Sequence, residues 1–228
     1  MSADQRYLFK PTKGSSHSWA ISWFEQLKPT DKVLDVGCGS CTLGEILKSR
    51  GITQIFALEN DAGAQAKARG IYLDVQSDLS NFAGQRFDCL LLLDVLEHLP
   101  TPEEFFKAAA QLLSPGGLIL ISVPNIAHWS IRLLLLLGRF DYTPRGLLDR
   151  THLQFFTRRR LRSLIRSDEG LEIVEFNSSI SPAEFVLPKF LVDSFLFDLF
   201  CSMRLFGARV WPGLCAYQHL AALRKQSS

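Results

Sequence analysis

Residues 33–42 read VLDVGCGSCT, an apolar run that passes through a turn with two glycines and into the start of a helix. Glycine lets the backbone adopt a positive φ and approach a ligand closely, and the first turn of a helix offers free N–H groups. The dinucleotide-binding motif G-x-G-x-x-G would need a third glycine where this chain has Thr42. The stretch therefore predicts a ligand-binding strand–loop–helix unit, and it counts against an enzyme that uses NAD or FAD.

Short apolar runs alternate with helix-like segments on both sides of this stretch, which is the pattern of a parallel sheet covered by helices. The run 89–93, CLLLL, is continuous rather than alternating, as expected for a central strand buried on both faces. The predicted strands are residues 32–36, 54–58, 71–75, 87–93, 117–123, 171–176 and 215–223. The predicted helices are residues 18–27, 42–49, 62–68, 102–113 and 157–165.

The composition is that of an ordinary globular protein: 228 residues, of which 47% are hydrophobic and 21% charged, with a formal net charge of +2. Five cysteines are too few, and an odd number, for a disulfide-stapled secreted module, so we expect a reducing compartment. The N-terminus lacks the apolar core of a signal peptide, and no segment has the roughly 18–20 apolar residues of a spanning helix. We expect one cytoplasmic domain over residues 1–228, with insertions at about 124–156 and 181–213 that form a lid or substrate pocket.

Three carboxylates follow three successive predicted strands: Glu59 the second, Asp78 the third and Asp94 the fourth. Because the carboxyl ends of parallel strands meet at one edge of a sheet, we expect these acids to converge on one crevice. Glu59 lies 20 residues beyond Gly39, the spacing at which dinucleotide folds place an acid on a ribose diol. The pattern predicts a ribose-bearing ligand beside the glycine loop.

Four blocks follow one another along the chain: DVGCG at 35–39, the acids Glu59 and Asp78, FDCLLLLDVLEHL at 87–99 and LLSPGGLILISVPN at 112–125. Together they resemble the class I S-adenosylmethionine-dependent methyltransferases over about residues 32–176, and residues 214–225 weakly match the final strand of that family. The resemblance implies an α/β, Rossmann-like sheet of seven strands, mostly parallel with the last strand antiparallel, and helices on both faces. It also implies a single methyltransferase domain with S-adenosylmethionine as its cofactor.

The resemblance assigns roles within the glycine loop. Gly37, Cys38 and Gly39 would line the methionine moiety of the cofactor, and Asp35 would support the loop. The family usually has a third glycine where this chain has Cys41. Residues 38 and 41 also form a C-x-x-C pattern, so a redox pair is the alternative interpretation of the loop.

The resemblance also assigns roles to the three acids. Glu59 would hold the ribose hydroxyls and Asp78 the adenine amino group. Asp94 would form the floor below the sulfonium. All seven residues of the loop and the acids are therefore expected in one cofactor site.

A second group of polar residues supplies the candidate catalytic residues. Glu97 and His98 follow the fourth predicted strand, and His152 stands beside aromatic residues just before a predicted helix. The arrangement is similar to that of metal-assisted O-methyltransferases, in which an acid-x-x-Glu-His block joins further ligands on a metal, here with Asp94 as the first acid. Metal-free methyltransferases carry a Glu-His-Leu block as well, so a metal and its absence both stand as alternatives. We expect His152 to act as a general base or as a substrate contact.

Two further segments bear on the acceptor. Residues 123–132 and 138–140 resemble a subgroup that includes MetW-type proteins of methionine biosynthesis and methyltransferases linked to cell-envelope glycans. This resemblance implies methylation of an oxygen or nitrogen on a small, sugar- or lipid-linked acceptor. The alternative is a MetW-like regulatory partner of a biosynthetic enzyme that retains the methyltransferase fold.

Charge and apolar patterning add two expectations about partners. Eight arginines and two aspartates in residues 139–166 give a local charge of +6, which would attract an anionic acceptor, whereas no segment matches a nucleic-acid-binding module. Residues 190–206 are amphipathic at helical spacing, and one face carries Phe195, Leu196, Leu199, Phe200, Met203 and Phe206. Packing as core or lid is the first interpretation of this face. A peripheral membrane contact, or a groove for a lipid tail, is the alternative.

Overall fold

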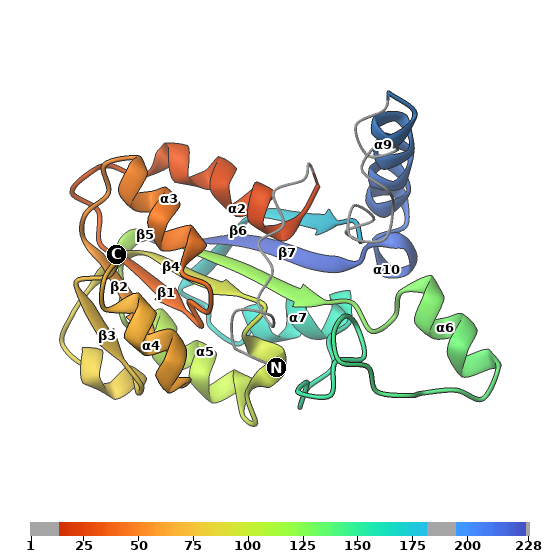
Figure 1. Ribbon diagram of the computed structural model, residues 1–228, viewed down its shortest axis with the longest axis horizontal. Coiled ribbons are helices and arrows are strands. Elements are labelled where there is room, and N and C mark those ends of the chain that lie inside the picture. Colours follow the sequence, from red (N-terminus) through yellow and green to blue (C-terminus); the bar gives the residue numbers. More distant parts are fainter. Residues whose placement is uncertain (1–13, 182–194, 227–228) are drawn as a thin grey trace.

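The computed structural model describes residues 14–181 and 195–226, which form one seven-stranded sheet in the order β3–β2–β1–β4–β5–β7–β6 (Figure 1). The strands are β1 (Val33–Val36), β2 (Ile55–Leu58), β3 (Asp74–Gln76), β4 (Phe87–Leu93), β5 (Leu113–Pro124), β6 (Leu171–Ser179) and β7 (Gln218–Lys225). Strands β1 to β5 pair in parallel, whereas β7 is antiparallel to both β5 and β6. The predicted fold class, a mostly parallel sheet with an antiparallel last strand, is confirmed.

The helices lie between the strands and in the two insertions. They are α2 (Ser16–Trp23), α3 (Thr42–Ser49), α4 (Ala62–Ala68), α5 (Pro102–Gln111), α6 (Trp129–Leu136), α7 (Arg158–Ile165), α9 (Phe195–Val210) and α10 (Pro212–Cys215). Three short 3-10 turns are η1 (Phe24–Gln26), η2 (Leu79–Phe82) and η3 (Leu96–His98). Each of the five predicted helices is present, with ends that differ by a few residues.

Strand β4 separates two hydrophobic cores, one on each face of the sheet. Its alternate side chains point to opposite faces, as the period of a strand requires. Leu91 joins the core beneath α2 and α3 together with Leu47, and Leu90 joins the core beneath α5 and α7 together with Phe106 and Leu161. Figure 1 shows these two pairs of helices on opposite sides of the sheet. The continuous apolar run of β4 is therefore buried on both faces, as its sequence predicts.

Strand β3 begins three residues later than the predicted strand 71–75. The N–H groups of Ile71 and Tyr72 both donate to the carbonyl of Ala68 at 2.8 Å, which extends the end of α4 into a turn. Tyr72 is 5% exposed and packs into the core beneath α3 instead of alternating along a strand. The difference arises because a tertiary contact of Tyr72 overrides the local β-propensity of residues 71–73.

The two expected insertions contain the remaining helices. Residues 124–156 include α6, and residues 181–213 include α9 and the start of α10, so that β7 begins at residue 218 rather than at the predicted 215. Residues 182–194 of the second insertion, and with them residues 190–194 of the amphipathic stretch, lie outside the described residues. No helix in residues 14–181 or 195–226 is long and apolar enough to span a bilayer.

Candidate active site

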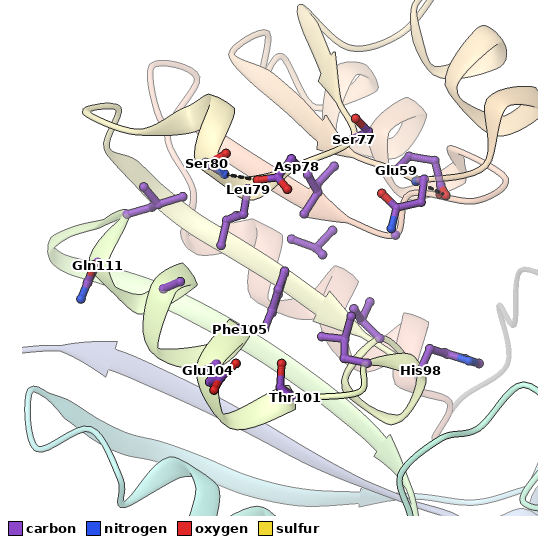
Figure 2. Close-up of a pocket in the computed structure, with 18 of the residues that line it drawn as sticks. Glu59, Ser77, Asp78, Leu79, Ser80, His98, Thr101, Glu104, Phe105 and Gln111 are labelled. Atoms are coloured by element: carbon purple, nitrogen blue, oxygen red, sulfur yellow. Dashed lines mark hydrogen bonds between the residues drawn. The ribbon is translucent and has the colours of Figure 1, made fainter.

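A cavity of about 720 Å³ opens at the carboxyl ends of β1, β2 and β4 (Figure 2). This volume lies within the range of small-molecule sites. Of the residues predicted for the site, five line the cavity: Gly37, Glu59, Asp78, Asp94 and His98. The apolar part of its wall is made by Leu58, Leu79, Val95, Leu99 and Phe105. In Figure 2, Glu59 and Asp78 lie on one side of the cavity and Phe105 of α5 lies on the other.

The glycine loop between β1 and α3 contains three residues with positive φ. These are Gly37 at +70°, Gly39 at +46° and Cys41 at +63°. A Cβ on Gly37 would lie 3.1 Å from the Val95 side chain, so a larger residue there would crowd the cavity wall. Cys41 adopts the left-handed conformation in which the family usually has glycine, and its N–H donates to the Cys38 carbonyl at 2.7 Å. The loop thus keeps its turn without the third glycine.

Glu59 connects the end of β2 to the glycine loop. Its Oε2 accepts a hydrogen bond from the N–H of Gly39 at 3.0 Å, and its Oε1 accepts from the N–H groups of Asn60 and Asp61 at 2.9 and 3.0 Å. The Cys38 thiol makes only a weak contact with Oε2, at 3.9 Å. A carboxylate has about four lone-pair positions, so Oε2 can still accept a hydrogen bond from a hydroxyl in the cavity. Glu59 therefore orders the loop and presents an acceptor at the same time.

Asp78 lies just beyond β3 and caps η2. Its Oδ1 accepts from the backbone N–H of Ser80 at 2.8 Å. Hydrogen bonds from the Ser80 side chain and backbone hold the pKa of Asp78 below its usual value, so the carboxylate is ionised at neutral pH. On the cavity wall, Leu79 lies beside Asp78 and Phe105 of α5 lies on the facing side (Figure 2). An amino group of a flat, apolar ring placed between these side chains would find its acceptor in Asp78.

Asp94 is held at the end of β4 by side chains of β5 and β7. Its backbone has a φ of +56°, and its carboxylate accepts from the Ser122 hydroxyl of β5 at 2.7 Å. The side-chain amide of Gln218, on β7, donates to both carboxylate oxygens at 2.6 and 2.8 Å. The amide orientation is fixed from the other side, because the Ser179 hydroxyl donates to the Gln218 oxygen at 2.8 Å. Sequence reasoning missed Ser122 and Gln218, because both contacts are tertiary: Ser122 lies 28 positions from Asp94, and Gln218 lies 124 positions from it.

The side chains of Asp35 and of the two loop cysteines are buried and do not line the cavity. The Tyr72 hydroxyl donates to Asp35 at 2.6 Å, and burial raises the pKa of Asp35 to about 7 even though this hydrogen bond lowers it. The sulfur atoms of Cys38 and Cys41 are 4.0 Å apart in the reduced form, and both residues are buried. Asp35, which is expected to support the loop, thus has as its hydrogen-bond partner a buried tyrosine that the sequence did not single out.

A compact group of Glu97, His98 and His152 lies beside the cavity. Each offers one ligand atom, and these atoms all lie within 4.8 Å of one another. The carbonyl of Glu97 accepts from the N–H groups of Leu153 and Gln154 at 2.8 and 2.9 Å, which brings the first insertion against η3. Only His98 of the three lines the cavity. Asp94 is not part of this group, because its carboxylate faces Ser122 and Gln218 instead.

His152 has the properties of a proton acceptor. It is 8% exposed, and its ring lies 4.9 Å from that of His98 in an edge-to-face arrangement. Burial, and secondarily the neighbouring His98, lower the pKa of His152, so its imidazole is neutral at neutral pH. Its Nδ1 is buried and has no hydrogen-bond partner in the described part of the chain.

The arginines of residues 139–166 do not gather at the cavity. No arginine is found among the described residues that line it. Arg160 forms an ion pair with Glu103 at 3.5 Å and lies over the Phe156 ring, while Arg158 and Arg162 lie over Phe176. The attraction of an anionic acceptor by this local charge stays a prediction.

The fold and the cavity together define a class of protein, the Rossmann-like S-adenosylmethionine-dependent methyltransferases. The donor set fits this cofactor: Glu59 offers an acceptor for a ribose hydroxyl, Asp78 one for an amino group, and apolar side chains flank the space between them. Residues 18–175 match the family described as the methyltransferase domain, and the chain belongs to this family. It is an enzyme of this class, and S-adenosylmethionine is its cofactor.

Curated relatives match about half of the chain or somewhat less. One is a ubiquinone biosynthesis O-methyltransferase of Idiomarina loihiensis, 33% identical over 126 residues that cover 50% of this chain and 52% of that protein. Another, of the same name from Escherichia coli, is 36% identical over 104 residues, which cover 41% of this chain and 43% of that protein. The chain thus spans about half the length of the relatives that it matches.

Solved structures share the fold over nearly the full chain. A SAM-dependent methyltransferase from Archaeoglobus fulgidus superposes with a TM-score of 0.59 at 17% identity, covering 93% of this chain and 95% of that one. A magnesium protoporphyrin IX methyltransferase from Synechocystis PCC 6803, with bound SAH (S-adenosylhomocysteine), gives a TM-score of 0.61 at 16% identity, covering 92% of this chain and 81% of that one. At such identities the likeness shows the fold alone, and the MetW-type subgroup stays a prediction.

Proposed function

We propose that this enzyme methylates a hydroxyl oxygen on a small, quinone-type acceptor that carries a lipid tail. The single observation that carries the proposal is the pair of His98 and His152, one at the cavity and the other buried against it. The relatives named as ubiquinone biosynthesis O-methyltransferases support an oxygen acceptor over a nitrogen acceptor. A lipid-linked acceptor is preferred to a sugar-linked one because the surface near the site is apolar, as described below.

An oxygen acceptor needs a base, and His152 supplies one. When bound, S-adenosylmethionine supplies a methyl group on a positively charged sulfur, and alignment with the acceptor then provides much of the rate. A hydroxyl is a poor nucleophile until it loses its proton, and a positioned base contributes about 10²–10⁴-fold to such a step. The lowered pKa of His152 keeps its imidazole unprotonated at neutral pH, so it can take this proton.

The other residues of the cavity would bind the cofactor and orient it. Glu59 would accept a ribose hydroxyl while it holds the N–H of Gly39, and Asp78 would accept the adenine amino group. Gly37 would leave room for the methionine moiety, because a side chain there would meet Val95. The apolar wall would exclude water from the transferred methyl group.

A divalent cation is the alternative to His152 as the group that makes the acceptor hydroxyl easier to deprotonate. Glu97, His98 and His152 place a carboxylate and two imidazoles within 4.8 Å of one another. These ligand types suit several first-row metals, and a bound cation would hold the acceptor oxygen directly. In this alternative His152 is a ligand rather than the base.

The place of the enzyme in the cell is part of the proposal. The chain has five cysteines, an odd number and too few for a disulfide framework, which favours a reducing environment. We propose the cytoplasm, with a peripheral contact at a membrane.

Calorimetry with S-adenosylhomocysteine, followed by methyl transfer from labelled cofactor to a soluble catechol, tests the proposal. We expect binding to the wild type and a loss of about tenfold or more in Glu59→Gln, because one charged acceptor is removed. His152→Gln should bind the cofactor product normally and lose about 10²–10⁴-fold in kcat. A chelator that abolishes transfer in the wild type would favour the cation. The proposal fails if His152→Gln retains full turnover and the chelator has no effect.

A further inference from the structure

The exposed large apolar side chains of the protein are concentrated in two segments. Of sixteen such residues among the described part of the chain, thirteen lie in residues 129–142 or 199–211. They are Trp129, Leu133, Leu135, Leu136, Leu137, Phe140 and Tyr142 in the first, and Leu199, Phe200, Met203, Phe206, Val210 and Trp211 in the second. Leu136 is 82% exposed and Phe206 is 70% exposed. Single exposed apolar residues are common, but a concentration of this kind marks an interaction surface.

The two segments are joined at their bases. The Asn125 side-chain amide, just before α6, donates to the carbonyl of Ala216 at 2.8 Å, and Arg132 of α6 reaches the carbonyl of Gly213 in α10 at 3.5 Å. Figure 1 shows α6 and α9 projecting from the same end of the molecule, the end opposite β3. We call the thirteen residues the apolar end.

The helices of the apolar end already pack against the protein through one side. The exposed apolar side chains therefore form a second apolar face on the same helices. Ile131 of α6 packs with Leu147 and Leu148, and Ala208 of α9 packs with Ile180 and Ala216. The apolar face predicted for residues 190–206 therefore does not serve as core where it is described, because Met203 and Phe206 of that face lie in solvent. No element of residues 14–181 or 195–226 covers these side chains.

The charge around the apolar end indicates what covers it. Residues 129–145 contain three arginines and one aspartate, and residues 195–211 contain two arginines and one aspartate. A surface with this positive excess repels a second copy of itself and attracts an anionic one. Trp129 and Trp211 are 53% and 68% exposed, and tryptophan with arginine around aliphatic residues is the composition of helices that lie in the headgroup region of a bilayer.

We propose that the apolar end docks the enzyme onto an anionic lipid bilayer. The leucines and phenylalanines enter the boundary between headgroups and acyl chains, while the arginines contact the lipid phosphates. The α6 part of the docking surface shares an insertion with the proposed catalytic histidine, because α6 packs on Leu147 and Leu148, and the same segment continues to His152. Docking therefore presents the acceptor site to the membrane, a conclusion that rests on the proposed function.

Sedimentation with vesicles tests the docking without reference to catalysis. The full chain is mixed with vesicles of equal parts phosphatidylglycerol and phosphatidylcholine, or of phosphatidylcholine alone. We expect the wild type to sediment with the anionic vesicles. The double variant Leu136→Ser/Phe206→Ser should bind at least about tenfold more weakly, since two large side chains no longer enter the lipid. Arg209→Gln should lose about fivefold, and Leu73→Ser, which changes an exposed leucine beside β3, should match the wild type.

Tryptophan quenching by brominated lipids locates the contact. Trp129 and Trp211 should be quenched, whereas Trp19 and Trp23, 9% and 7% exposed in the core beneath α2, should not. The proposal is overturned if the folded wild type stays in the supernatant with anionic vesicles, or if the double variant binds as the wild type does. It is also overturned if the wild type forms a dimer that the double variant cannot form and neither binds vesicles. Binding of S-adenosylhomocysteine, measured on the same samples, reports separately on the proposed function.

Discussion

Cys41 shows how one residue can keep a glycine conformation without being glycine. Its φ of +63° costs a side-chain-bearing residue about 1–2 kcal/mol, yet the residue is fully buried and packs in the core beneath α3. The backbone strain at Cys41 destabilises the folded state, whereas the burial of its side chain stabilises it. The sequence predicted a departure from the family pattern at this position, and the structure shows that the backbone of the loop is nevertheless retained.

The balance at Cys41 can be measured against Cys89, which is also 0% exposed but lies in the extended strand β4. Cys41→Gly should change the free energy of unfolding by less than about 1 kcal/mol, because the relieved strain offsets the lost burial. Cys89→Gly relieves no strain and should cost about 2–3 kcal/mol. Urea unfolding of both variants checks the difference, and equal losses would show that the Cys41 backbone is not strained.

Asp35 makes the stability of the protein depend on pH. Its folded pKa of about 7 lies above its ordinary value of 3.8, so folding favours the protonated form. The stability that this preference contributes is complete below about pH 4 and is lost as the pH rises through about 7. Relative to Asp35→Asn, the wild type should therefore lose free energy of unfolding over this window, at up to about 1.4 kcal/mol per pH unit.

Urea unfolding of the wild type and Asp35→Asn at about pH 5 and about pH 8 measures this effect. Tyr72→Phe is the informative companion, because it removes the hydrogen bond that lowers the Asp35 pKa and should move the loss to higher pH. Parallel pH profiles for the wild type and Asp35→Asn would contradict the raised pKa.

Strand β7 orients Asp94, a role that its position at the end of the sequence does not predict. It is the last element of the chain, yet it pairs with β5 and places Gln218 against Asp94 at the end of β4. The antiparallel insertion of β7 between β5 and β6 is what brings residue 218 to the carboxyl edge of the parallel strands. The position of Asp94 on the cavity wall thus depends on the order of the strands and not on a local motif.

Gln218→Leu should weaken the binding of S-adenosylhomocysteine about tenfold, because Asp94 loses two donors and its orientation. Ser179→Ala is the milder control: it removes only the hydrogen bond that orients Gln218 from the far side, leaves both donors to Asp94 in place, and should lose less affinity. Calorimetry on samples of equal folded fraction separates affinity from stability. Equal affinities of Gln218→Leu and the control would show that β7 does not order the cavity.

The sequence predicts the sheet well because its information there is local. The strand–glycine–helix stretch at 33–42, the buried run of β4 and the acids after three strands all follow from short-range patterns. What it does not predict is tertiary: the turn made by Tyr72, the clamp of Gln218 on Asp94 and the exposure of Met203 and Phe206. A helical apolar pattern has the same appearance whether its partner is a core or a membrane, so only the packed structure separates the two.

At the scale of the whole molecule, the two ends differ in the residues that they carry. Glu59 and Asp78 of the cavity follow β2 and β3 at one end of the molecule, whereas α6 and α9, which carry the exposed apolar side chains, project from the opposite end (Figure 1). The histidine site lies on the insertion that joins them, with Glu97 of η3 bound to the residues that follow His152. An acceptor with a polar head and an apolar tail matches this division.

This division predicts that membrane docking and chemistry can be separated by the choice of acceptor. With anionic vesicles, the wild type should methylate a catechol with a long prenyl tail at least about tenfold faster than Leu136→Ser/Phe206→Ser, because only the docked enzyme meets an acceptor confined to the bilayer. The two proteins should methylate a tail-less, water-soluble catechol at equal rates, since the substitutions lie outside the cavity. Equal rates on the tailed acceptor would mean that docking does not deliver the substrate. A shared loss on the tail-less acceptor would instead mean that α6 and α9 support the fold of the histidine site, through the packing of Ile131 on Leu147 and Leu148.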